Sequence, residues 1–126
     1  MRNVETPHAP HPAGHYSQAV VHGGLVFVSG QLPHDVGRPG GAPGDVEAQT
    51  ERALRNVEAI LEAAGSGLDR LLSVTVYVAD VALWPRVNAA YARVLGAHRP
   101  ARAVVPVKEL HHGYLVEVQA VAAVRE

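Results

Sequence analysis

The stretch Leu115–Val124 reads LVEVQAVAAV, and its alternation indicates a β-strand that decides what kind of sheet the chain builds. Every second residue from Val116 onward is Val or Ala, which defines one apolar face. The opposite face carries Glu117 and Gln119, but also Leu and further Val and Ala residues. An antiparallel strand with one solvated face shows a clean apolar–polar alternation. Since neither face here is properly polar, we expect both faces of the sheet to be covered.

Four further runs have the composition or alternation of strands. Leu71–Val78 alternates throughout, so Leu72 and Val74 are expected on one face, and Leu71 and Ser73 on the other. The glycines of His22-Gly23-Gly24 favour a hairpin turn between two short apolar runs. These strands are expected at Tyr16–Val21, Leu25–Ser29, Leu71–Val78 and Arg102–Val107.

Two helices are indicated by capping residues and apolar periodicity. Asp45 suits the N-cap of a helix that runs to about Ala64, and Gly65 supplies the C-terminal stop. Pro85 fits the first turn of a second helix, where no backbone N–H is needed. The expected buried stripes are Leu54, Val57, Leu61 and Ala64 on the first helix, and Val87, Ala90, Tyr91, Val94 and Leu95 on the second.

The resulting order, β-β-α-β-α-β-β, favours one α+β domain over residues 1–126, with a single mixed sheet and two helices packed on one face. Residues 1–14 are rich in Pro and lack periodicity, so we expect an irregular N-terminal arm. Two helices cover only one face of a sheet that is apolar on both. We therefore expect the second face to be buried in a closed homo-oligomer.

Composition excludes several classes of function. The formal net charge is −1 and no stretch concentrates Lys or Arg, which argues against nucleic acid as a partner. The absence of Cys excludes disulfides and Cys-ligated metal centres. The histidines fit no standard zinc spacing, so no metal site is expected. No apolar run approaches the roughly 20 residues of a membrane helix, and no signal-peptide pattern is present, so we expect no membrane partner and a cytoplasmic location.

Arg102 lies where a loop containing Pro100 turns into an apolar strand. A guanidinium cannot lose its proton, and it presents a rigid fork of donors suited to a carboxylate. At the start of a half-buried strand, such a group needs an anionic partner. Two partners remain open at this point. An internal acid, notably Glu117, would make a structural ion pair, whereas a ligand carboxylate would make Arg102 part of a site for small organic acids.

Several short motifs together resemble the RidA/YjgF family of small imine and enamine deaminases. They follow the family's order from about Gly14 to Ala123, and Pro-Ala-Arg followed by Val-Glu-Val is the most specific pair. The matching pieces are Tyr16–Ala19, Val28–Gln31, Gln49, Asn56, Asn88, Tyr91, Pro100–Arg102 and Val116–Val118.

The resemblance implies a chorismate-mutase-like fold and a homotrimer with clefts between neighbouring subunits. It also implies hydrolysis of reactive 2-imino acids, or of their 2-aminoacrylate-type enamine tautomers, to 2-keto acids and ammonia. The chain would then be a 2-iminobutanoate/2-iminopropanoate-type deaminase that needs no cofactor and no metal. Its partners would be the small-molecule substrate and two further copies of itself.

The resemblance also assigns roles to residues of this chain. Arg102 would bind the substrate carboxylate, and Glu117 would orient the attacking water and take its proton. Main-chain groups near Ser29-Gly30 and Val104 would contact the reacting nitrogen and the water. The expected substrate-binding residues are Tyr16, Ser29, Gly30, Asn88 and Val104.

Two departures from the family pattern are present, and two other functions remain open. Val104 stands where the family often has Cys, and His111-His112 replaces the usual Pro after the strand. One alternative is a non-catalytic trimer that binds small carboxylates through Arg102 alone. Another is a pathway-specific deaminase for an amino-muconate or aminoacrylate-type substrate.

Overall fold

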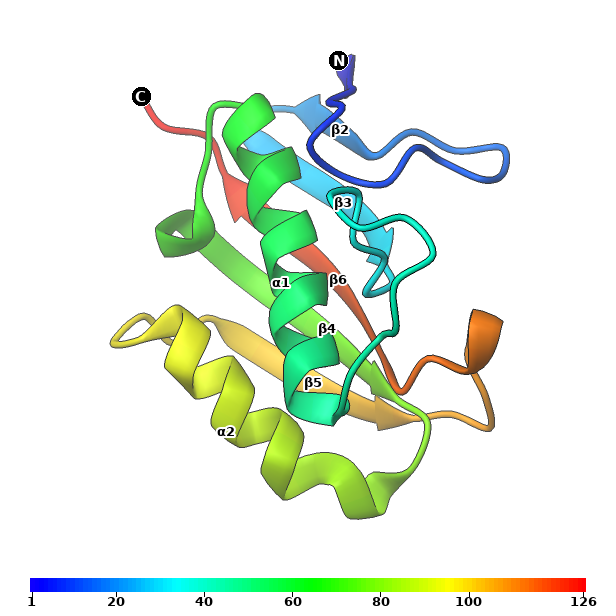
Figure 1. Cartoon of the computed structure of the whole chain (residues 1–126). Coiled ribbons are helices and arrows are strands. Elements are labelled where there is room, and N and C mark those ends of the chain that lie inside the picture. The colour runs from blue at the N-terminus through cyan, green and yellow to red at the C-terminus, as the bar shows by residue number, and fades with distance from the viewer.

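A computed structural model describes all 126 residues as one six-stranded mixed sheet with two helices on one of its faces (Figure 1). The α+β class and the position of both helices confirm the prediction. Across the sheet the strands lie in the order β1-β2-β3-β6-β4-β5, and only β4 and β5 run parallel. The elements are β1 Arg2–Val4, β2 Ala19–His22, β3 Leu25–Gln31, α1 Val46–Ala63, η1 Leu68–Arg70, β4 Leu71–Val78, η2 Val81–Leu83, α2 Trp84–Leu95, β5 Ala101–Pro106, η3 His111–Gly113 and β6 Val116–Ala123.

Both helices begin and end close to where their capping residues predict. The Asp45 side chain accepts a hydrogen bond from the Ala48 N–H at 2.9 Å, which satisfies one of the free donors of the first turn of α1. Gly65 follows α1 with φ of 80°, a conformation that disfavours residues with a Cβ. Pro85 lies in the first turn of α2. Neither helix is long and apolar enough to cross a bilayer.

The core lies between the sheet and the two helices. The residues of β6 that alternate from Val116 to Ala122 are buried there, as is the stripe Leu54, Val57 and Leu61 of α1. Burying one such Val or Leu side chain stabilises the fold by about 1.5–3 kcal/mol. Because this face of the sheet is closed by helices, residues at the intervening positions of the strands point to the opposite face.

The N-terminal segment is more ordered than the expectation of an irregular arm. Arg2–Val4 forms β1, which pairs antiparallel with β2 at the edge of the sheet. The buried Gln18 holds the following residues: its carbonyl accepts from the Thr6 N–H at 2.7 Å, and its amide donates to the Thr6 and Pro10 carbonyls at 3.1 and 2.9 Å. Sequence patterns miss β1 because a three-residue strand has almost no periodicity, and its partner lies far along the chain.

The expected alternation of β4 fails at its first two residues. Leu71 is buried on the helix side and opposes Ala122, whereas Ser73 already opposes Val121. Leu72 is therefore an extra residue in a β-bulge and is 47% exposed on the open face. From Val74 onward the alternation is as predicted, with Val74, Val76 and Val78 buried.

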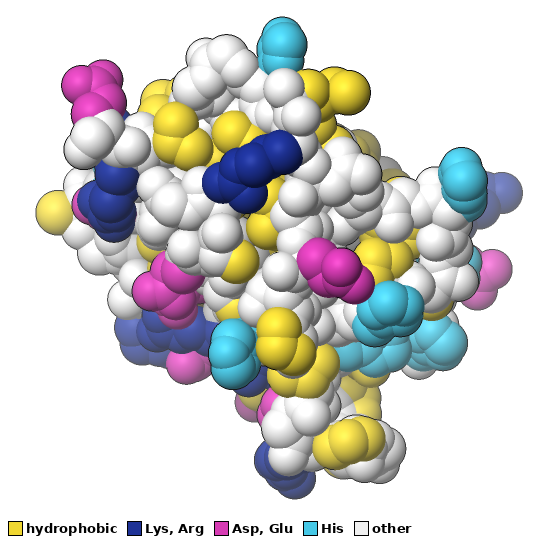
Figure 2. Space-filling view, turned by 90° about the horizontal axis from the view of Figure 1, so that it is seen from above, with side chains coloured by type: hydrophobic (Ala, Val, Ile, Leu, Met, Phe, Trp, Pro, Cys, Tyr) yellow, Lys and Arg dark blue, Asp and Glu magenta, His cyan; other side chains and the backbone are white.

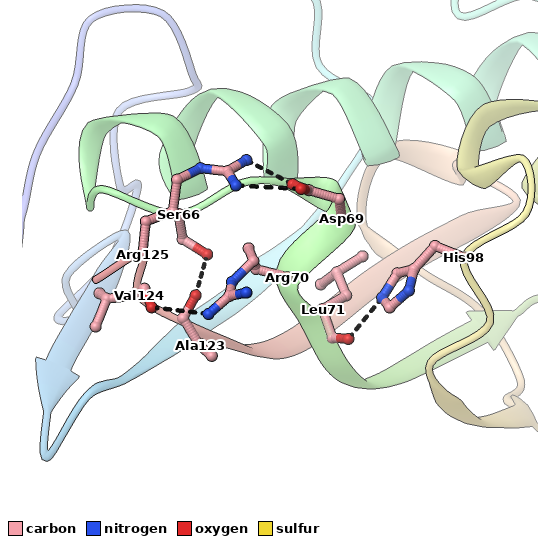
Figure 3. Close-up of polar contacts among 8 residues, drawn as sticks. All are labelled: Ser66, Asp69, Arg70, Leu71, His98, Ala123, Val124 and Arg125. Atoms are coloured by element: carbon pink, nitrogen blue, oxygen red, sulfur yellow. Dashed lines mark hydrogen bonds and ion pairs between the residues drawn. The ribbon is translucent and has the colours of Figure 1, made fainter.

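Polar contacts fix the end of β6 and the entry to β5 (Figure 3). The Ser66 hydroxyl donates to the Ala123 carbonyl at 2.6 Å, and Arg125 donates to both carboxylate oxygens of Asp69 at 3.1 and 2.5 Å. A ring nitrogen of His98 lies 2.8 Å from the Leu71 carbonyl oxygen. This last contact fixes the turn that leads from α2 into β5, and so the point at which Arg102 leaves the loop.

The face of the sheet without helices is open in the single chain, and the part of it around Phe27 is apolar. Phe27 is 46% exposed there, next to Val20 of β2 and Val121 of β6, its partners across the ladder. Together with the exposed Leu72 these side chains form a row that crosses several strands. An uncovered apolar surface of this kind marks an interaction site.

Candidate functional site

Arg102 lies on β5, which forms one edge of the sheet, and its side chain faces α2. In the parallel ladder it pairs with Val74, which is buried on the helix side. Its guanidinium carbon lies 4.6 Å from the ring centroid of Trp84 and 4.7 Å from that of Tyr91. Its Nη1 donates a hydrogen bond to Asn88 Oδ1 at 3.0 Å. The guanidinium is exposed and is held against one face of α2.

No carboxylate of the chain lies within ion-pair distance of Arg102. The four ion pairs are Arg52–Asp35, Arg55–Glu58, Arg86–Glu47 and Arg125–Asp69. An Arg102–Glu117 pair, one of the two possibilities left open by the sequence, is therefore absent. Of the five N–H donors on the guanidinium, one is used by Asn88, and the remaining donors are free for a ligand.

Glu117 lies on the opposite face of the sheet from Arg102. On β6 it pairs with Tyr77, between the buried residues Val116 and Val118. Its carboxylate is half-buried and makes neither an ion pair nor a side-chain hydrogen bond within the chain. A Cβ at Gly30 would collide with its Oε2 atom. Glycine at position 30 therefore makes room for this carboxylate.

Ser29 and Gly30 lie in an irregularity of β3 beside Glu117. The register between β3 and β6 shifts between Val28 and Gln31, as a β-bulge does, and such bulges are frequent next to active sites. The Ser29 hydroxyl donates to the Ser17 carbonyl at 2.6 Å, which fixes the segment that carries Tyr16. Tyr16 itself is 51% exposed.

Val104 lies on β5 together with Arg102. Its side chain pairs with Val76 and packs against the core, so it offers no functional group to a ligand. Because β5 is an edge strand, half of its backbone N–H and C=O groups point away from β4. These groups are available to a ligand or to another chain, as the expected backbone role requires.

The seven expected residues thus form two groups. Arg102, Asn88 and Val104 lie at β5 and α2, whereas the others lie at β3, at β6 and in the loop before β2, and one chain does not bring the two groups together. The contacts of Trp84 and Tyr91 with Arg102 are not predicted from the sequence. The positions 84, 88 and 91 could have indicated them, since they line one face of a helix.

Comparisons with known proteins identify the family. The family model described as Endoribonuclease L-PSP matches residues 6–124. A RutC family protein of Pyrococcus horikoshii is 41% identical over 119 residues, which cover 94% of each chain. The chain belongs to the RidA/YjgF family. Among solved structures, the YjgF gene product of E. coli is similar to this RidA/YjgF protein with a TM-score of 0.93 at 36% identity, covering 99% of this chain and 100% of that chain. E. coli TdcF with bound serine has a TM-score of 0.92 at 33% identity, with both chains fully covered.

A depression of this RidA/YjgF protein lies apart from both groups, and none of the seven residues lines it. It has a volume of about 800 Å³ and lies between residues 33–44, α1 and the pair His112 and Tyr114. Tyr114 Oη lies 2.9 Å from His34 Nδ1, and burial together with the neighbouring His112 lowers the pKa of His34. The lining has acidic as well as basic side chains, and no cluster of three His, Asp or Glu is placed to hold a metal ion.

Proposed function

We propose that this RidA/YjgF protein hydrolyses 2-imino acids, of the 2-iminobutanoate and 2-iminopropanoate type, and their enamine tautomers to 2-keto acids and ammonia. The observation that carries the proposal is Arg102: an exposed guanidinium, held in place by α2, that has no carboxylate partner in its own chain. A planar fork with free donors suits a carboxylate that comes from a ligand. The substrate class carries such a group next to its C=N bond.

In the proposed mechanism, Arg102 holds the carboxylate and thereby positions the imine carbon. Glu117 accepts a proton from a water molecule, whose oxygen attacks that carbon. The carbon–oxygen bond forms as the electron pair of the C=N bond moves to nitrogen. The nitrogen takes up the proton held by Glu117, which gives a tetrahedral carbinolamine. The hydroxyl proton of this species then passes to the nitrogen as the C–N bond breaks, so that ammonia leaves and the carbonyl forms. Positioning of this kind lowers the activation barrier by several kcal/mol, up to about 7–11.

The mechanism needs a second copy of the chain, because Arg102 and Glu117 face opposite sides of one sheet. We propose a homotrimer in which Arg102 of one subunit and Glu117 of its neighbour line a shared cleft. The open apolar face around Phe27 and Leu72 supports association, since a lone chain would leave these side chains in water. The free outer edge of β5 supports a contact close to Arg102.

The name of the family model suggests RNA cleavage, and the charges of this chain favour small anions over RNA. Four arginines are engaged in ion pairs, and the formal net charge is −1. On the face shown in Figure 2, basic and acidic side chains are intermixed, and no large patch of basic side chains is present. A polyanion binds to a continuous basic surface, whereas a small carboxylate needs one well-placed guanidinium.

The test is a coupled assay in which an amino-acid oxidase or a dehydratase produces imines in solution. The wild-type protein should accelerate the release of keto acid, and both Arg102→Ala and Glu117→Gln should remove this acceleration. Light scattering on each variant checks that the assembly persists. Binding of keto acids without turnover would favour the carboxylate-binding alternative, and full activity in Arg102→Ala would refute the proposal. Incubation with single-stranded RNA in parallel measures any nuclease activity.

A further inference from the structure

We infer that Trp84, Asn88 and Tyr91 are positioning residues that hold the Arg102 guanidinium as a preformed receptor for the substrate carboxylate. The inference rests on the proposed function, adds Trp84 and Tyr91 to its site, and gives Asn88 a positioning role. It also assigns a direction to the guanidinium: one edge faces α2, and another remains free for the ligand.

The three residues form one stripe of α2. They lie at positions i, i+4 and i+7, which share a face of an α-helix, and α2 runs alongside β5 in Figure 1. Arg102 reaches this stripe because the parallel register pairs it with Val74, on the helix side of the sheet. The stripe therefore contacts the guanidinium at three points: two aromatic rings, at 4.6 and 4.7 Å, and one amide oxygen, at 3.0 Å.

These contacts use the guanidinium in a way that leaves it able to bind a carboxylate. A cation over an aromatic face is attracted by the ring quadrupole, and this attraction consumes none of its N–H donors. Asn88 accepts from Nη1 alone. The edge formed by Nε and Nη2 keeps two parallel donors, which is the geometry that a carboxylate accepts in a bidentate pair. The site thus orders the cation while its hydrogen-bonding edge stays free.

Ordering matters because Arg102 is exposed. A free arginine on a surface samples many rotamers, and a ligand that binds it must immobilise the side chain. With the guanidinium already fixed by α2, the ligand avoids most of that cost. The expected gain in affinity is about three- to tenfold, which corresponds to ordering one long side chain.

Trp84 gives the cleanest test of the two rings. Tyr91 is 7% exposed and part of the core, so its truncation would also disturb packing, whereas Trp84 is half-buried. Trp84 is also the only Trp of the chain, and it lies against Arg102. Its fluorescence should therefore report directly on a carboxylate that binds to the guanidinium of the wild-type protein.

The experiment measures the dissociation constant of pyruvate, with methyl pyruvate as the uncharged control ligand. Wild type is titrated by Trp fluorescence and by calorimetry. Trp84→Leu, Trp84→Phe, Arg102→Ala and the control Val81→Ala, which truncates an exposed residue one turn before Trp84, are titrated by calorimetry. Melting temperatures are measured for all. In the coupled assay, Trp84→Leu should raise KM more than it lowers kcat, because it weakens the hold on the carboxylate.

We expect Trp84→Leu to weaken pyruvate binding about three- to tenfold. Trp84→Phe should lose less affinity than Trp84→Leu, because an aromatic ring remains. Val81→Ala should bind pyruvate as wild type does. Equal pyruvate affinity in Trp84→Leu and wild type would overturn the inference while the proposed function stands. Unchanged affinity in Arg102→Ala, or no binding by wild type, would overturn the assignment of the carboxylate site itself. If Trp84→Leu lost the same factor of affinity for pyruvate and for methyl pyruvate, Trp84 would have a merely structural role, and this result would also overturn the inference.

Discussion

Replacing Gly30 by Ala tests whether the position of the Glu117 carboxylate controls the reaction. A Cβ at position 30 would overlap Glu117 Oε2 and lie 3.1 Å from Glu117 Cδ. Gly30 is not among the glycines with positive φ, so the backbone itself accepts Ala. The carboxylate at the end of a flexible side chain must therefore move, and leaving its rotamer costs about 0.5–1.5 kcal/mol. We expect a melting temperature that falls by only a few degrees.

The effect on catalysis should be much larger than the effect on stability. A displacement of about 1 Å in a catalytic group lowers the rate by about 10²-fold, equivalent to roughly 2.7 kcal/mol in the barrier. The coupled imine assay on Gly30→Ala measures this loss. Gly37→Ala is the control, because there the added methyl meets only Asp35 Oδ1 at 3.3 Å, in a loop apart from Glu117.

A double variant shows whether the loss passes through Glu117. If it does, Gly30→Ala combined with Glu117→Gln should be no slower than Glu117→Gln alone, since the two changes remove the same function. A Gly30→Ala protein with wild-type kcat and KM would refute the reasoning. A double variant in which the rate losses of the two single variants multiply would also refute the reasoning.

Four further predictions concern assembly and stability. Phe27→Glu should reduce the mass in light scattering from three times 13.3 kDa to one chain, because it places a charge in the apolar face; an unchanged mass would show that this face is not the interface. Tyr91→Phe should leave the melting temperature unchanged or raise it, because the buried hydroxyl has no hydrogen-bond partner. Burial raises the pKa of Tyr91 against the smaller opposing effect of Arg102, so the wild type should lose stability as pH rises above about 10, and Tyr91→Phe should lose less in a denaturant titration. Burial and His112 lower the pKa of His34, so stability should fall as pH drops below about 6.5, and His34→Phe should flatten this fall in melting curves.

The parts of the fold that the sequence predicts are those determined by neighbouring residues. Asp45 and Gly65 mark the ends of α1, since an N-cap and a left-handed glycine act within one turn. The bulge at Leu72 could not be predicted in this way. It depends on where β4 meets β6, and both Leu71 and Leu72 are apolar enough to suit either face.

The candidate site, like the fold, is predicted from the sequence only in part. Arg102 and Glu117 stand out in the sequence as charges in apolar strands, and the family resemblance suggests their roles. That they face opposite sides follows only from the ladders, which pair Arg102 with Val74 and Glu117 with Tyr77. The spacing of Trp84 and Tyr91 on α2 is visible in the sequence. That β5 is the strand facing these two residues depends on its parallel pairing with β4, which no local sequence pattern encodes.

The short strand β1 has a practical consequence for handling the protein. It begins at Arg2 and ends at Val4, so the sheet on that side terminates in a three-residue edge that is too short to recruit other chains readily. Residues of a purification tag fused directly before Met1 would lengthen this edge and add unpaired main-chain groups wherever they continue β1 in an extended conformation. A flexible Gly/Ser spacer, or a tag placed after Glu126, would preserve the short edge and so the solution behaviour of the untagged chain.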